Sequence, residues 1–92
     1  MIPATLRICD RTYAVAVQPM LGDLGACDVG GQSITIDEGA HPETQASVLL
    51  HEVLEAVNST MGLRLKHHTI DALETALYGV LTMNDPWWKE SR

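Results

Sequence analysis

The residues best suited to chemistry lie together in the middle of the chain, at His51, Glu52 and Glu55. His51 and Glu55 are four residues apart, so on a helix they project from one face and can hold one cation between them. Glu52 is rotated from His51 by about 100° on a helix, where it does not share the ligand shell but can reach a water bound to the same ion. The pattern predicts two metal ligands beside a carboxylate that transfers protons.

A solvated helix face is the alternative, because a histidine and two acids on a helix of an acidic protein usually do no chemistry. Two features favour the metal site. The three polar residues directly follow an apolar run at residues 48–50 and interrupt the most apolar helix of the chain. In addition, His67 and His68 stand at the entry of the next helix, where a short connector brings one of them onto the first pair.

Of these two histidines, we expect His67 to be the third ligand. It falls between Leu65 and Ile70, which should both face the apolar side of the first helix. A position near a helix N-terminus also favours a neutral imidazole, the form that binds a metal ion. His68 is expected to be exposed, and it replaces His67 only if His67 points away.

The segment LLHEVLEAVN, residues 49–58, resembles the active-site helix of the zincin metallopeptidases, whose motif is His-Glu-x-x-His. Glu55 stands where the second histidine of that motif belongs. The segment is more similar to small phage and prophage proteins with a minimal zincin-like domain, which carry His-Glu-x-x-Glu-Ala-x-Asn and then Leu-x-His-x-x-Ile. Residues 65–70 match the second motif, and the similarity spans residues 33–85.

This resemblance implies a zincin-like fold and a zinc-dependent hydrolase of the peptidase type, acting on a peptide or protein. His51, Glu55 and His67 would hold the metal, and Glu52 would be the catalytic base. Two histidines and one carboxylate are the ligand inventory of thermolysin-type zinc sites, and they also suit Fe²⁺ as an alternative to Zn²⁺. Zinc would lower the pKa of a bound water to about 7, and Glu52 would pass its proton to a leaving amine.

A second hypothesis is a non-catalytic, phage-encoded interaction module that uses the zincin-like fold as a scaffold. The net charge of −6 and the Trp87-Trp88 pair favour it. An acidic phage protein can bind a basic host or virion protein, and indoles are common anchors at interfaces.

Composition limits the other classes of function. The chain of 92 residues is 46% hydrophobic and 20% charged, which predicts one folded domain over residues 1–92. Its acidic balance argues against a nucleic-acid partner. It has neither an apolar run of the roughly 18–20 residues that span a bilayer nor a signal peptide, so we expect no membrane partner and a cytoplasmic location, the host cytoplasm if the protein is phage-encoded. Cys9 and Cys27 are expected to be buried thiols.

The pattern of apolar and turn residues along the chain predicts an α+β fold, in which a sheet and two helices position the site. Residues 1–39 alternate between short apolar segments and turns, and indicate a small antiparallel sheet of three to four strands. A motif helix is expected over residues 42–62, with Pro42 in its first turn and Gly62 at its end. A second, antiparallel helix packs on it over residues 68–84, followed by a tail over residues 85–92.

Several remaining polar residues are expected near these helices. His41 is expected as a helix cap or loop residue, and Asn58 as a group that hydrogen-bonds a ligand. Asp71 and Glu74 are expected on a solvated face, with hydrogen bonding to the metal ligands as the alternative. Tyr78 is expected at the helix interface, with stabilisation of an oxyanion as the alternative. The second helix should turn five apolar residues inward, namely Ile70, Leu73, Leu77, Val80 and Leu81.

Overall fold

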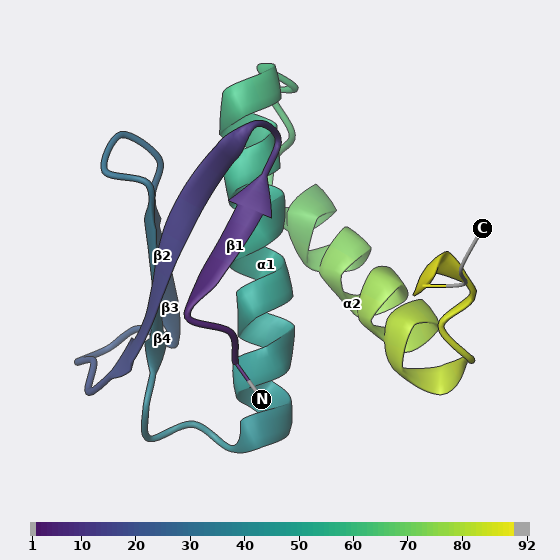
Figure 1. Ribbon diagram of the computed structural model, residues 1–92, viewed down its shortest axis with the longest axis horizontal. Coiled ribbons are helices and arrows are strands. Elements are labelled where there is room, and N and C mark those ends of the chain that lie inside the picture. The colour runs from purple at the N-terminus through teal and green to yellow at the C-terminus, as the bar shows by residue number, and fades with distance from the viewer. Residues whose placement is uncertain (1, 90–92) are drawn as a thin grey trace.

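The structure, a computed structural model, describes residues 2–89, with the side chain of Trp88 left aside (Figure 1). A four-stranded sheet is followed by two helices, which confirms the predicted α+β class. The elements are β1 (Thr5–Ile8), β2 (Arg11–Gln18), β3 (Gly25–Asp28), β4 (Ser33–Asp37), α1 (Pro42–Met61), α2 (His67–Met83) and a short 3₁₀ helix (Trp87–Lys89). Within the described residues, no helix is long and apolar enough to cross a membrane.

The sheet has the order β1-β2-β4-β3 and is mostly, but not entirely, antiparallel. Its central pair, β2 and β4, is parallel, with Val15 opposite Ile34 and Val17 opposite Ile36. The prediction of a purely antiparallel sheet is therefore wrong at this pair. Ile34 and Ile36 are buried, whereas β3 is short and partly exposed, so β4 takes the central position and β3 forms an edge.

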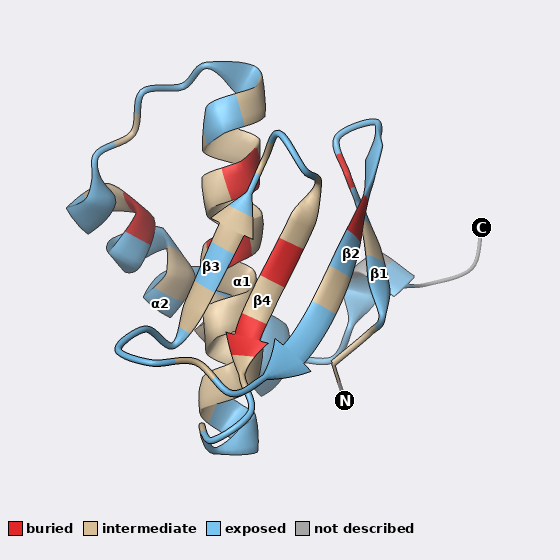
Figure 2. Cartoon of the chain, turned by 90° about the vertical axis from the view of Figure 1, so that its left-hand side faces the viewer, coloured by how far each residue is buried: buried red, intermediate tan, exposed pale blue. Residues whose placement is uncertain are grey.

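α1 covers one face of the sheet, as Figures 1 and 2 show from two sides. Its apolar stripe packs on a core of strand residues, with Ala56 fully buried among them. The predicted bounds of this helix are confirmed: Pro42 is its first residue, and the left-handed Gly62 caps its last turn. At the other end, the Nδ1 atom of His41 accepts a hydrogen bond from the backbone N–H of Glu43, as expected for a capping residue.

α2 lies on the side of α1 away from the sheet, runs back in the opposite direction and slants away from α1 toward its C-terminal end (Figure 1). It begins one residue earlier than predicted, at His67, and only Ile70 of its five expected inward residues is buried. The expectation was wrong for the other four, Leu73, Leu77, Val80 and Leu81, which are each more than a third exposed. Leu77 and Leu81 follow Ile70 by seven and eleven residues and so share its helix face. Because α2 slants away from α1 (Figure 1) and no other described element packs on it, its apolar stripe is covered only in part.

Candidate functional site

The three predicted metal ligands come together between α1 and α2. The Nε2 atom of His51 lies 3.5 Å from Oε2 of Glu55, and Nδ1 of His67 lies 3.9 Å from the same oxygen. The two imidazole rings are 5.3 Å apart between centroids. One ligand atom from each residue lies within 4.8 Å of the others, so this group could hold a single metal ion.

The connector between the helices explains why His67 reaches this position. Asn58 on α1 accepts a hydrogen bond of 2.8 Å from the backbone N–H of Leu65 and donates one of 3.3 Å to the carbonyl of the same residue. These two hydrogen bonds hold the connector against the last turns of α1. Asn58 was predicted to hydrogen-bond a metal ligand, but its amide group binds the backbone of Leu65 instead. His67 lies two residues after Leu65 and turns Nδ1 toward Glu55, although its side chain is 72% exposed; the neighbouring His68 is exposed as well.

Glu74 is the residue of this site that the sequence reading placed elsewhere. It was expected on a solvated face, but its side chain is only 20% exposed, and Oε1 lies 2.8 Å from Nδ1 of His51. The hydroxyl of Ser47 donates a hydrogen bond to its other oxygen. A signal for this position existed, because Glu74 follows the buried Ile70 by four residues and so shares its face of α2.

His51 is thereby held at both ring nitrogens. With Nδ1 bonded to the carboxylate of Glu74, Nε2 is left to face Glu55 and His67, which is the arrangement that fixes the tautomer of a metal-binding histidine. Asp71, which is 54% exposed, lies at the rim, 3.4 Å from Nδ1 of His51 and 3.4 Å from Nε2 of His67. His51, Asp71 and Glu74 form a second, overlapping group that could hold a cation.

Glu52 points from α1 toward β3 and is 8% exposed. Its carboxylate makes no hydrogen bond or ion pair with any residue in the described part of the chain. Burial raises its pKa, and the charges of Glu55 and Glu74 add to this, while His51 and His67 oppose it. A buried carboxylate with a raised pKa is suited to accept and return a proton.

The pKa values of two residues near Glu52, His51 and Cys27, are also raised. Burial lowers the pKa of His51, but the hydrogen bond to Glu74 and the surrounding carboxylates outweigh it, so the net shift is upward. Burial, with the charge of Glu52 next in size, raises the pKa of Cys27 to about 11, so this half-buried thiol stays protonated at neutral pH. Cys9 is exposed, which corrects the expectation that it is buried.

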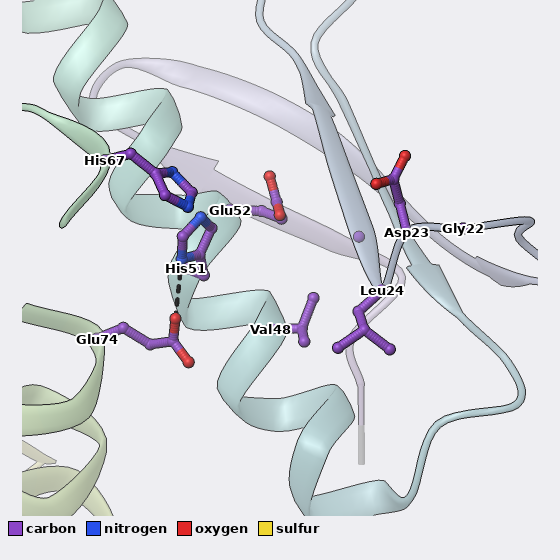
Figure 3. A pocket seen from close by; sticks show the side chains of 9 residues that line it. Gly22, Asp23, Leu24, Val48, His51, Glu52, His67 and Glu74 are labelled. Atoms are coloured by element: carbon purple, nitrogen blue, oxygen red, sulfur yellow. Dashed lines mark hydrogen bonds and ion pairs between the residues drawn. The ribbon is translucent and has the colours of Figure 1, made fainter. Parts of the chain in front are cut away.

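A cavity of about 340 Å³ lies between the helices and the loop that joins β2 to β3 (Figure 3). His51, Glu52, His67 and Glu74 line it on the side of the helices. The loop forms the wall opposite the helices. None of its residues was predicted to belong to the site. The lining residues are Gly22, Asp23, Leu24, Gly25, Val48, His51, Glu52, His67 and Glu74.

Gly25 lets the strand and helix approach closely at this cavity. A Cβ atom placed there would lie 2.4 Å from Cγ1 of Val48 and 3.1 Å from Oε2 of Glu52. Only a residue without a side chain therefore fits beside the Glu52 carboxylate.

Two other predicted residues lie away from the cavity lining. The hydroxyl of Tyr78 donates a hydrogen bond of 3.4 Å to the carbonyl of Glu43, which confirms its place at the helix interface. Trp87 is 56% exposed in the short 3₁₀ helix, and residues 90–92 of the predicted tail lie outside the described residues.

In comparisons with known proteins, no family model, curated protein or solved structure matched this chain.

Proposed function

We propose that the protein is a metal-dependent hydrolase of peptide bonds with a minimal zincin-like site. The observation that carries this proposal is a buried, unpaired carboxylate, Glu52, beside a group of three ligand atoms within 4.8 Å of one another. Two of the three ligand residues, His51 and His67, line the same cavity as the Glu52 carboxylate. A general base next to a Lewis-acid site is what the hydrolysis of an unactivated amide requires.

The ligand chemistry fits Zn²⁺, and Fe²⁺ is the alternative. His51 and His67 supply nitrogen and Glu55 supplies oxygen, a set of three that leaves a position open. A metal ion held by these three residues would supply a Lewis acid for the substrate carbonyl and for water. Glu52 accepts the proton of the attacking water and returns it to the leaving amine, and Glu74 keeps His51 in the required orientation.

Zinc titration against a competing chromogenic chelator tests the ligand set. The wild-type protein should bind one equivalent, and His51→Ala and His67→Ala should each lower the affinity at least tenfold. His68→Ala is the matched control, since this neighbour belongs to neither of the ligand groups among the described residues and should change the affinity little. If Asp71→Ala weakens binding more than His67→Ala does, the ion belongs to the overlapping group instead; wild-type protein that binds no metal would contradict the proposal.

Hydrolysis is tested separately with a library of fluorescence-quenched peptides. Zinc-loaded wild-type protein should cleave some of them, and Glu52→Gln should abolish cleavage while it still binds zinc. Retained cleavage in Glu52→Gln would show that another group is the base.

An interaction module is the second candidate function. The observation in its favour is that Met83 is 84% exposed and Trp87 56% exposed at the end of α2 remote from the ligand group. If removal of residues 87–92 abolishes the biological effect and Glu52→Gln leaves it intact, binding accounts for the function and catalysis does not.

A further inference from the structure

The cavity is strongly acidic. Asp23, Glu52 and Glu74 line it, and none of its lining residues is a lysine or arginine. Glu55 and Asp71 add two more carboxylates, each within 4 Å of a site histidine. A divalent ion would balance two of these five charges, so the cavity stays negative when a metal is bound. Glu52 is buried and the Glu74 side chain is 20% exposed, so their charges are less screened than those of Asp23 and Asp71, which are exposed.

The burial of Glu52, as distinct from its charge, is a second indication of a polar ligand. The residue is more than nine-tenths buried, it points into the cavity (Figure 3), and no described side chain or backbone group hydrogen-bonds to it. A buried carboxylate without a partner is costly, and the cost falls when a ligand or its water supplies one.

Apolar and charged side chains occupy different parts of the cavity. Leu24 and Val48 form an apolar strip between the helices and the loop, below the Glu52 carboxylate in Figure 3. Asp23 lies beside Leu24 on the loop, across the cavity from His51. An alkyl chain that ends in a cation matches this order of surfaces, because its stem packs on apolar atoms while its charged end meets a carboxylate.

We propose that the preferred substrate is a peptide with a lysine or arginine side chain next to the bond that is hydrolysed. This inference rests on the proposed function and names its substrate class. The aliphatic stem lies along Leu24 and Val48, and the ammonium or guanidinium group pairs with Asp23. A free N-terminal amine would offer the same positive charge without the stem, so the test separates the two sources.

The test measures binding by calorimetry to the zinc-loaded protein. The probes are capped peptides, acetyl-Ala-Ala-Xaa-Ala-Ala-amide, in which Xaa is lysine, its uncharged isostere norleucine, or glutamate. We expect the lysine peptide to bind at least tenfold more tightly than the norleucine peptide, with the glutamate peptide weakest. Asp23→Asn should reduce the ratio of lysine to norleucine affinity several-fold. Asp10→Asn, which removes the same charge from the exposed turn between β1 and β2, should leave the ratio unchanged.

Two results would overturn the substrate assignment. One is equal or absent binding of the lysine and norleucine peptides. The other is tighter binding of an uncapped all-alanine peptide than of the capped lysine peptide, which would assign the cation to the N-terminus. Neither result bears on metal binding, whereas a protein that fails the zinc titration overturns the proposed function itself.

Discussion

At the scale of single residues, the site depends on how His51 is held. Its two ring nitrogens face different partners, Glu74 on one side and the Glu55–His67 pair on the other. The carboxylate of Glu74 is in turn held by Ser47. A ligand that is oriented in this way loses little conformational entropy when it binds a metal ion, so residues that never touch the ion affect its affinity.

Glu74→Ala should therefore weaken zinc binding about 10–100-fold without removing a ligand. Chelator competition measures the change. Glu38→Ala is the matched control, since Glu38 is exposed and does not line the cavity. An equally large loss from Asp71→Asn would contradict a purely orienting role, because it would indicate that Glu74 and Asp71 bind the ion themselves.

The buried carboxylate of Glu52 should destabilise the metal-free protein. Because its folded pKa lies above its ordinary value of 4.5, the free energy of unfolding falls as the pH rises from about 4.5 through the raised pKa. At pH 7 with a chelator present, Glu52→Gln should raise the free energy of unfolding by about 1–3 kcal/mol. The gain should shrink toward about pH 4, where wild-type Glu52 is protonated.

Urea denaturation at the two pH values measures this effect, with Glu38→Gln as the control for net charge. A Glu52→Gln protein that is no more stable than wild type at pH 7 would show that the carboxylate is well solvated.

At the scale of elements, the site is built where α1 crosses the edge strand β3. The helix supplies His51, Glu52 and Glu55, and the strand approaches so closely that it has a glycine at the contact. Gly25 sets the distance between the two walls of the cavity. Its role is steric, since its φ angle is not in the left-handed region.

Gly25→Ala should lower the free energy of unfolding by about 1–3 kcal/mol, because the new methyl group would overlap Val48, whose branched side chain has little freedom to move. Gly79→Ala is the matched control in α2, where an added Cβ would meet no atom within 4 Å. It should raise stability by about 0.5–1 kcal/mol through helix propensity. Thermal denaturation of both variants measures these changes. A Gly25→Ala protein as stable as wild type would contradict the steric explanation.

At the scale of the whole molecule, α2 packs on α1 and on no other described element. One of its residues, Ile70, is fully buried, and four large apolar residues further along the helix are more than a third exposed. The proposed ligands come from both helices, so a bound ion would join α2 to α1. We expect metal binding to stabilise the fold for this reason.

Zinc at a hundred times its dissociation constant should add about 2.7 kcal/mol to the free energy of unfolding. For a domain of this size, that corresponds to a rise of roughly 10–20 °C in Tm. Differential scanning fluorimetry with zinc and then with EDTA measures the rise and its reversal. His67→Ala should lose most of the rise and His68→Ala little of it, and equal rises in both variants would contradict a ligand role for His67.

The local features of this protein could be read from its sequence because they depend on neighbouring residues. The spacing of apolar residues and the positions of Pro42 and Gly62 determine α1, and the i, i+4 geometry of a helix brings His51 and Glu55 to one face. The choice of His67 over His68 likewise followed from the apolar positions at Leu65 and Ile70, and the structure places His67 beside Glu55.

Features that depend on the tertiary structure could not be read in this way. Alternating residues fix which side of a strand faces the core but not which strand lies beside it, so the parallel pairing of β2 with β4 was missed. The spacing of Glu74 from Ile70 indicates which helix face it shares, but its contact with His51 arises only when α2 lies across that residue. The same holds for Asp23 and Gly25, which are separated from the motif by more than twenty residues and become cavity walls only because β3 packs against α1.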